Sequence, residues 1–72
     1  MKIVQKYDLS NMKPLIQNDN YALYGMEYIN DKIRKGVRLN KKTNEQVDVV
    51  IEMIPKVRVI EIIRNGVRQK LY

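Results

Sequence analysis

Residues 47–72 constrain the fold most, because their pattern fits extended strands and not a helix. Eleven of these 26 residues are Val or Ile, whose branched Cβ atoms pack well on a pleated sheet. Apolar and polar residues alternate at the start of the stretch, which places Val47, Val49, Ile51 and Met53 on one side of an extended chain. An amphipathic helix would need apolar residues three and four apart. We therefore predict a strand over residues 47–53 and expect the other segments to pack against it.

The rest of this stretch predicts a hairpin. Pro55 cannot donate a hydrogen bond to a sheet, so we expect a turn there and a second strand over residues 57–63. Asn65-Gly66 is the best two-residue hairpin signal in the chain, because a type I′ turn needs positive φ at both central residues. Residues 67–72 should therefore fold back along the second strand.

A turn at Asn65-Gly66 also sets the register of the hairpin. Glu61 then faces Lys70, an opposite-charge pair that turns its face toward water. The other face becomes the expected core side, and it carries Ile60, Ile62, Val67 and Leu71. Apolar side chains also lie on the water side, so we expect the second strand to be covered on both faces, as a central strand is. These side chains are Val57, Val59 and Ile63.

The first half of the chain has shorter strand patterns. Residues 2–7 alternate loosely, and residues 21–29 fit a strand better than a helix because Tyr favours strands and Gly25 disfavours a helix. A strand at 21–29 would place on one face Ala22, Tyr24, Met26 and Tyr28.

Polar turns separate these patterns. Residues 18–20 (Asn-Asp-Asn) predict a turn, because short polar side chains bond to the nearby backbone. Residues 37–39 predict a short strand that a polar loop joins to the strand at 47–53. The side of Val47 and Val49 would then also carry Val37 and Leu39.

Length and charge limit the class of protein. At 72 residues there is room for one domain, which we place over residues 1–72. The chain has 14 Lys and Arg against 8 Asp and Glu, a net charge of +6 that is spread along its length. Such a charge permits attraction to nucleic acid or to acidic proteins. No stretch has the apolar length of a signal peptide or a membrane span, so we expect a cytoplasmic protein without membrane association.

A catalytic or metal site is hard to assemble from this composition. With no Cys and no His, the chain lacks thiolate nucleophiles, imidazole bases and the usual zinc and haem ligands. Ser10 is the only serine, and no histidine exists to activate it. The three glycines are isolated, so the sequence has no phosphate-binding loop. We therefore predict no enzyme activity, no cofactor and no metal.

Tyrosines followed by cations form the most promising candidate site. Tyrosines on a sheet face can stack on bases while nearby cations neutralise phosphates. The candidate residues are Tyr21, Tyr24, Tyr28, Lys32, Arg34 and Lys35. The alternative is that one or two of these tyrosines belong to the core and that the charges belong to a solvated loop. A second basic surface, or simply a soluble edge strand, would comprise Arg58, Arg64, Arg68 and Lys70.

Residues 21–39 resemble SH3 domains. The run at 22–26 (Ala-Leu-Tyr-Gly-Met) looks like the Ala-Leu-Tyr-Asp-Tyr of that family, and the run at 35–39 (Lys-Gly-Val-Arg-Leu) looks like its Lys-Gly-Asp-x-Leu. Tyr24 matches the first tyrosine of the SH3 groove, whereas Met26 replaces the second and the chain has no Trp. The resemblance therefore implies the barrel and not the proline-peptide site. Over residues 37–67 the chain is also similar to small Bacillus prophage proteins with an SH3-like fold, which implies a phage setting and no known activity.

The strand pattern and these resemblances predict a mostly-β protein, a small SH3-like partial barrel of five to six antiparallel strands. The leading hypothesis for its function is a protein-protein interaction module with an unidentified protein partner. The alternative is a nucleic-acid-binding barrel that uses the tyrosines and cations at residues 21–35. We favour a monomer over an oligomer, and an open edge strand is the route by which self-assembly would occur.

Overall fold

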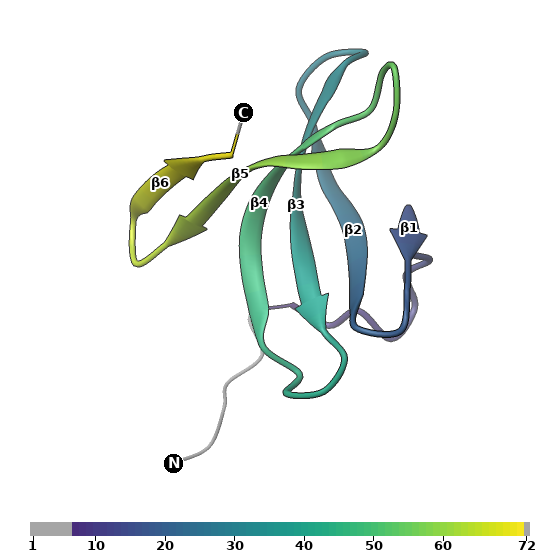
Figure 1. Ribbon diagram of the computed structural model, residues 1–72. Coiled ribbons are helices and arrows are strands. Elements are labelled where there is room, and N and C mark those ends of the chain that lie inside the picture. The colour runs from purple at the N-terminus through teal and green to yellow at the C-terminus, as the bar shows by residue number, and fades with distance from the viewer. Residues whose placement is uncertain (1–6, 72) are drawn as a thin grey trace.

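The structure, a computed structural model, describes residues 7–71, which form one antiparallel sheet of six strands (Figure 1). The strands are β1 (Ile16–Gln17), β2 (Tyr21–Tyr28), β3 (Ile33–Asn40), β4 (Gln46–Glu52), β5 (Arg58–Arg64) and β6 (Val67–Lys70). Their order across the sheet equals their order along the chain. Residues 7–71 contain no helix, and so none that could cross a membrane. The predicted fold class is confirmed: the chain is all-β, and its open, curved sheet is consistent with a small partial barrel.

The strand boundaries match the sequence expectations best in the C-terminal half. β4 and β5 lie within one residue of the strands predicted at 47–53 and 57–63. β3 is longer than the predicted strand at 37–39, because its cationic first half also pairs with β2 and β4. β1 was not predicted. The strand predicted at 2–7 lies outside the described residues except for Tyr7, which is not in a strand.

One face of the sheet, the inner face, carries the main core. Val47, Val49 and Ile51 alternate along β4 and are buried, with Ile51 wholly inaccessible to solvent. Leu23 of β2 joins this cluster, and Val59 of β5 packs against it. Full burial of such a side chain contributes roughly 1.5–3 kcal/mol. The alternation predicted for β4 is confirmed.

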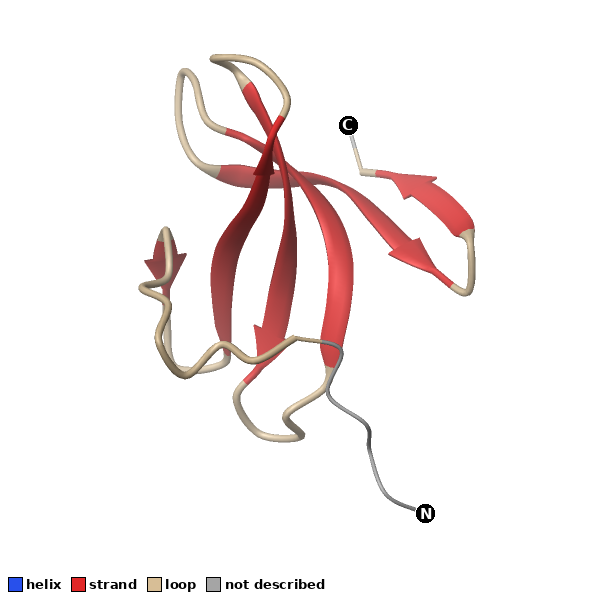
Figure 2. Cartoon of the chain, turned by 180° about the vertical axis from the view of Figure 1, so that it is seen from behind, coloured by secondary structure: helices blue, strands red, loops and turns tan. Residues whose placement is uncertain are grey.

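The opposite face, the outer face, is buried where the N-terminal segment crosses the sheet (Figure 2). Val37 of β3 is 1% exposed, and Ala22 and Val50 are buried on the same face. Tyr7 attaches the segment, because its backbone N–H donates to Gln46 Oε1 at 2.9 Å and Gln46 Nε2 donates to its carbonyl at 2.9 Å. The middle of β3 and of β4 is therefore buried on both faces.

The predicted facing of β3 against β4 is wrong by one residue. Arg38 is opposite Val47, so Val37 and Leu39 lie on the outer face, away from Val47 and Val49. A shift of one residue moves every side chain of a strand to the other face. Because both faces of this sheet bury apolar residues, alternation alone does not select between the two registers.

A bulge at Ile60 changes which residues of β5 meet the core. The pairing with β4 matches Val59 to Ile51 and resumes at Glu61, so Ile60 is an extra residue. Val59 and Ile62 consequently both pack against the inner-face core. The prediction that Ile60 and Ile62 share the core side, with Val59 on the water side, is therefore wrong. β5 is half-buried up to residue 63, short of the full coverage expected of a central strand.

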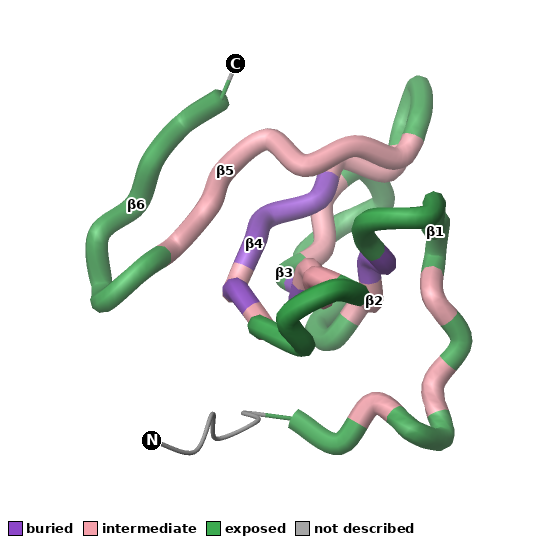
Figure 3. Tube along the Cα trace, turned by 60° about the horizontal axis from the view of Figure 1, so that its bottom comes forward, coloured by how far each residue is buried: buried purple, intermediate pink, exposed green. Residues whose placement is uncertain are grey.

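The β5–β6 hairpin turns at Asn65-Gly66 as predicted, with φ of 51° and 77° at the two residues. The four predicted pairs from Arg64 opposite Val67 to Glu61 opposite Lys70 are all present. β6 adds little to the core, because Val67 is 69% exposed and Leu71 is 40% exposed. Their placement on the core side is therefore wrong. The hairpin projects to one side of the other strands (Figures 1 and 3), so alternation continues there without a covering layer.

Candidate binding groove between β1 and β5

A groove of about 210 Å³, the β1–β5 groove, lies where the curled sheet brings its first strand near the start of β5 (Figure 3). It is lined by Ile16, Gln17, Asn18, Tyr21, Leu23, Arg38, Val57 and Val59. Most of this lining is apolar or aromatic, and none of it is a carboxylate.

The apolar wall of the groove is continuous with the core. Leu23 belongs to the buried inner-face cluster, and Val57 and Val59 pack against that cluster from the other side. Ile16 lines the groove from β1 and is 48% exposed. An apolar group that entered the groove would therefore contact a rigid surface on one side and an exposed isoleucine on the other.

Asn18 and Lys41 hold β1 in place. Asn18 Oδ1 accepts hydrogen bonds from the backbone N–H groups of Asn20 and Tyr21 at 2.8 and 2.9 Å, which fixes the predicted turn. Lys41 Nζ donates to Gln17 Oε1 at 2.8 Å. β1 is an end strand of the sheet, paired only with β2 among the described residues. Both of its residues, Ile16 and Gln17, line the groove.

Among the residues that the structure describes, Arg38 is the only charged one that lines the groove. It is half-buried, and its cross-strand neighbours on the inner face are Leu23 and Val47. Its guanidinium carbon lies 4.7 Å from the centroid of the Tyr21 ring. Within residues 7–71, no ion pair joins it to a carboxylate.

The six residues predicted as one surface do not share a face. The β2–β3 pairing shifts between Gly25 and Glu27, so Met26 is an extra residue of β2. Tyr24 is opposite Val37 on the outer face, whereas Tyr28 is opposite Arg34 on the inner face. The predicted single face of Ala22, Tyr24, Met26 and Tyr28 is therefore wrong.

Two tyrosine–arginine pairs replace the predicted surface. Tyr21 stacks with Arg38 in the groove, and Tyr28 lies under Arg34, with 5.6 Å from the guanidinium carbon to the ring centroid. Lys35 lies on the outer face opposite Val50. Lys32 lies in the turn before β3, where its carbonyl accepts the backbone N–H of Met53 at 2.7 Å. The structure thus brings together two of the six predicted residues, Tyr28 and Arg34, and separates the others.

Tyr28 and Arg34 lie outside the groove. The Tyr28 hydroxyl donates to Asp31 Oδ1 at 2.6 Å, and this bond to a carboxylate raises the pKa of Tyr28 above its usual value, against the smaller opposing effect of Arg34. Arg34 Nε is buried and has no hydrogen-bond partner among the described residues. This pair lies at the turn end of the β2–β3 hairpin.

Tyr24 faces the N-terminal segment instead. It lines a hollow of about 300 Å³ on the outer face with Asp8, Leu9, Ser10, Leu39 and Gln46. Ser10 Oγ donates to Asp8 Oδ1 at 2.6 Å and its backbone N–H donates to the same oxygen at 3.0 Å, and these bonds lower the pKa of Asp8. The Met12 backbone N–H donates to the Leu9 carbonyl at 3.1 Å, so the chain turns at this point.

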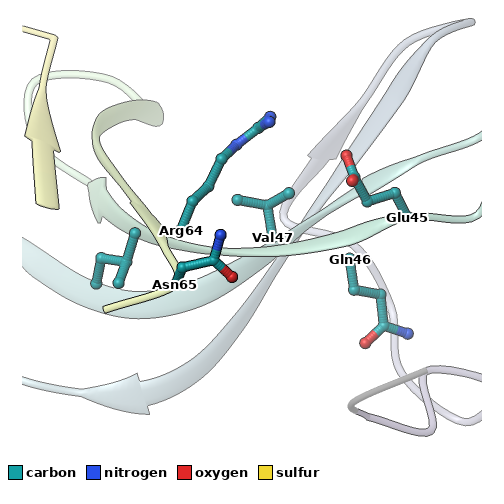
Figure 4. A pocket seen from close by; sticks show the side chains of 6 residues that line it. Glu45, Gln46, Val47, Arg64 and Asn65 are labelled. Carbon is teal, nitrogen blue, oxygen red and sulfur yellow. The ribbon is translucent and has the colours of Figure 1, made fainter. Parts of the chain in front are cut away.

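The basic residues predicted on the C-terminal hairpin are spread over both faces. Arg58 Nε donates to Glu52 at 2.9 Å, and Arg68 Nε donates to Glu61 at 3.1 Å. Glu61 faces Lys70 in register, as predicted, yet its carboxylate bonds Arg68 diagonally. Arg64 lines a hollow of about 230 Å³ between the end of β5 and the start of β4 (Figure 4). The other lining residues are Glu45, Gln46, Val47, Ile63 and Asn65. These cations do not form one continuous patch.

Of the residues that line the groove, only Tyr21 was among the site residues predicted from the sequence. Arg38 was visible only as a cation between two apolar residues, and its face depended on the register with β4. In the sequence, Ile16 is only part of a short apolar pair before a turn.

Within residues 7–71, no group of three or more acidic, His or Cys side chains is placed to hold a metal ion.

No model of a known protein family matches this chain, and no curated protein and no solved structure is detectably similar to it.

Proposed function

We propose that this protein is a non-enzymatic binding module that takes an extended segment of a partner protein into the β1–β5 groove. The observation that carries this proposal is the groove itself, a mostly apolar gap beside an end strand of the sheet. An extended segment can add to an exposed sheet edge through its backbone while alternate side chains enter pockets. β1 offers such an edge, and Leu23, Val57 and Val59 offer the apolar contacts.

The size of the groove supports this class of ligand. Its volume of about 210 Å³ lies below the range of roughly 300–1,000 Å³ that is usual for small-molecule and cofactor sites. One or two apolar side chains need less room than a cofactor. The groove therefore suits part of a peptide better than a whole small ligand.

Nucleic-acid binding is the second candidate function, and the net charge of +6 is the observation that favours it. The tyrosines give it less support. Tyr24 is on the outer face, and one face of each of the Tyr21 and Tyr28 rings is occupied by an arginine. Base stacking would have to use the other face of each of those two rings.

We further propose that the protein acts as a monomer in the cytoplasm. Its net charge supports the monomer, because charge of one sign keeps copies apart. We also propose an origin in a phage genome, on the basis of the resemblance suggested by residues 37–67.

The test is selection of peptides from a displayed library of random short sequences against the full chain. Ile16→Lys places a charge in the groove at a residue that is already 48% exposed, so the fold should tolerate it. Ile29→Lys is the matched control, because Ile29 is 44% exposed and does not line the groove. Peptides selected on the wild-type chain should lose at least about tenfold in affinity on Ile16→Lys and keep it on Ile29→Lys.

Two outcomes would overturn the proposal. One is a selection that yields only peptides that bind both variants equally, which would place the binding surface elsewhere. The other is a selection that yields no peptide while labelled oligonucleotides bind with an affinity that falls steeply with salt, which would establish the second candidate. Circular dichroism of both variants verifies that each is folded.

A further inference from the structure

We infer that the partner segment is acidic, and that it presents an Asp or Glu carboxylate to Arg38 with an apolar residue two positions away. This inference rests on the proposed function of the β1–β5 groove. It names the chemistry of the ligand, which the shape of the groove alone does not.

The first step is the electrostatic environment of Arg38. Its cross-strand neighbours are two apolar core residues, Leu23 and Val47, and Arg38 is half-buried, so part of its side chain is withdrawn from water. A partly desolvated cation is stabilised by a nearby anion. No carboxylate lines the groove, and no ion pair reaches Arg38 from the described residues. Residues 7–71 thus supply no anion to this cation, and a ligand could supply one.

The second step is the orientation of the guanidinium. Tyr21 lies 4.7 Å below the guanidinium carbon, a distance at which the ring attracts the cation through its face. A guanidinium whose face rests on a ring keeps its edge available, and the edge carries the parallel N–H groups that bind a carboxylate with two hydrogen bonds. Tyr21 is therefore a positioning residue for Arg38.

The third step is the spacing of the ligand. Successive side chains of an extended chain point to opposite sides, so residues two apart point the same way, about 6.6 Å from each other. If the acidic residue meets Arg38, the residue two positions away on the same side reaches the apolar wall formed by Val57 and Val59. The expected pattern is an acidic and an apolar residue with one residue between them.

Arg34 provides a matched control for Arg38. The two arginines lie on the same strand and the same inner face, and each rests on a tyrosine of β2. Arg34 does not line the groove. Replacing it removes the same charge from the same strand without altering the proposed contact.

The experiment compares the peptides that the displayed random library yields on three chains: wild type, Arg38→Gln and Arg34→Gln. The wild-type and Arg34→Gln pools should be enriched in Asp or Glu two positions from an apolar residue, and the Arg38→Gln pool should lose this enrichment. For one peptide of the wild-type pool, replacing its acid by the amide should weaken binding to wild type by about tenfold. The same replacement should not change binding to Arg38→Gln.

A conservative variant separates charge from geometry. Arg38→Lys keeps the charge and loses the planar fork, so it should retain part of the acidic preference with a weaker affinity. Tyr21→Leu should reduce the preference while Tyr21→Phe, which keeps the ring, should preserve it. Thermal unfolding of every variant shows whether it is folded.

The possible failures are distinguishable. A wild-type pool that depends on Ile16 but shows no acidic enrichment overturns this inference and leaves the groove as the binding site. A pool with acidic enrichment that survives Arg38→Gln and is lost in Arg34→Gln also overturns it. A selection that yields no peptide dependent on Ile16 overturns the proposed function, and this inference with it.

Discussion

Two parts of the molecule share the same alternating pattern but differ in burial. One is the sheet formed by β2, β3 and β4, and the other is the hairpin formed by β5 and β6. Within residues 7–71, the seven buried hydrophobic residues all lie in β2, β3 and β4, and none lies in the hairpin. The N-terminal segment covers one face of β3 and β4, and the start of β5 covers part of the other (Figure 3). The end of the hairpin has neither cover.

This difference shows what alternation measures. A period of two indicates an extended chain, and it reports burial only where another layer covers the strand. Val37 and Val67 both follow the pattern, but Val37 is 1% exposed and Val67 is 69% exposed. The central sheet should therefore determine stability, and the hairpin should tolerate change.

The largest expected effect is at Gly36 in the centre of β3. A Cβ there would collide with the backbone carbonyl of Tyr24 and lie 2.6 Å from Ile51 Cδ1. Because a backbone atom cannot move aside cheaply, Gly36→Ala should cost about 3 kcal/mol or more in free energy of unfolding. Urea denaturation followed by circular dichroism measures this loss. Gly25→Ala is the control, since its nearest neighbour is the flexible end of Leu15 at 3.3 Å, and an equal loss in both variants would contradict the explanation.

The next effect compares one buried and one exposed aliphatic residue. Ile51→Ala removes three side-chain carbons at a site with no solvent exposure, so we expect a loss of about 2–5 kcal/mol. Val67→Ala should change the free energy of unfolding by less than about 0.5 kcal/mol. Denaturation curves of both variants measure the difference. A loss above about 1 kcal/mol for Val67→Ala would mean that β6 is covered in solution by a layer that residues 7–71 do not supply.

A smaller effect is expected at Gly66 in the hairpin turn. Gly66 has φ of 77° and nothing lies within 4 Å of the position of an added Cβ. Gly66→Ala should therefore cost only the backbone strain of the left-handed region, roughly 1–2 kcal/mol. The measurement is again chemical denaturation. A loss as large as that of Gly36→Ala would show that the hairpin is as tightly constrained as the central sheet.

The smallest effect concerns the Tyr28 hydroxyl at the end of the β2–β3 hairpin. Its hydrogen bond to Asp31 raises the pKa of Tyr28, so the stabilisation is present below the ordinary tyrosine pKa and is lost as pH rises through the raised value. Asp31→Asn should return the pKa of Tyr28 toward that of an ordinary tyrosine. Titration of the Tyr28 ring carbons by NMR measures this change. An unchanged pKa in Asp31→Asn would show that the carboxylate is not its cause.

The sequence alone predicted the fold from signals that are local. The Val and Ile alternation at 47–53 predicted β4, and Asn65-Gly66 predicted the turn and the register of the hairpin, because turn chemistry acts over neighbouring residues. Both survive in the structure within one residue.

Apart from Tyr21, the residues of the candidate site were not predicted, because the site depends on distant pairings. Whether Tyr24 and Tyr28 share a face depends on a bulge at Met26 that the pattern of the strand does not reveal. The groove depends on the curl that brings residues 16 and 59 to one cavity, 43 residues apart in the chain. The position of Arg38 in the groove depends on both of these features.

The chain-order pairing of the strands also determines how fast the molecule should fold. Each strand pairs with the strand that precedes it in the chain, so each pairing closes only a short loop. Little chain entropy is therefore lost before each pairing forms. We expect folding faster than that of a β-sandwich of equal length. The exception is the bond between Tyr7 and Gln46, which spans 39 residues, so docking of the N-terminal segment should be the last event.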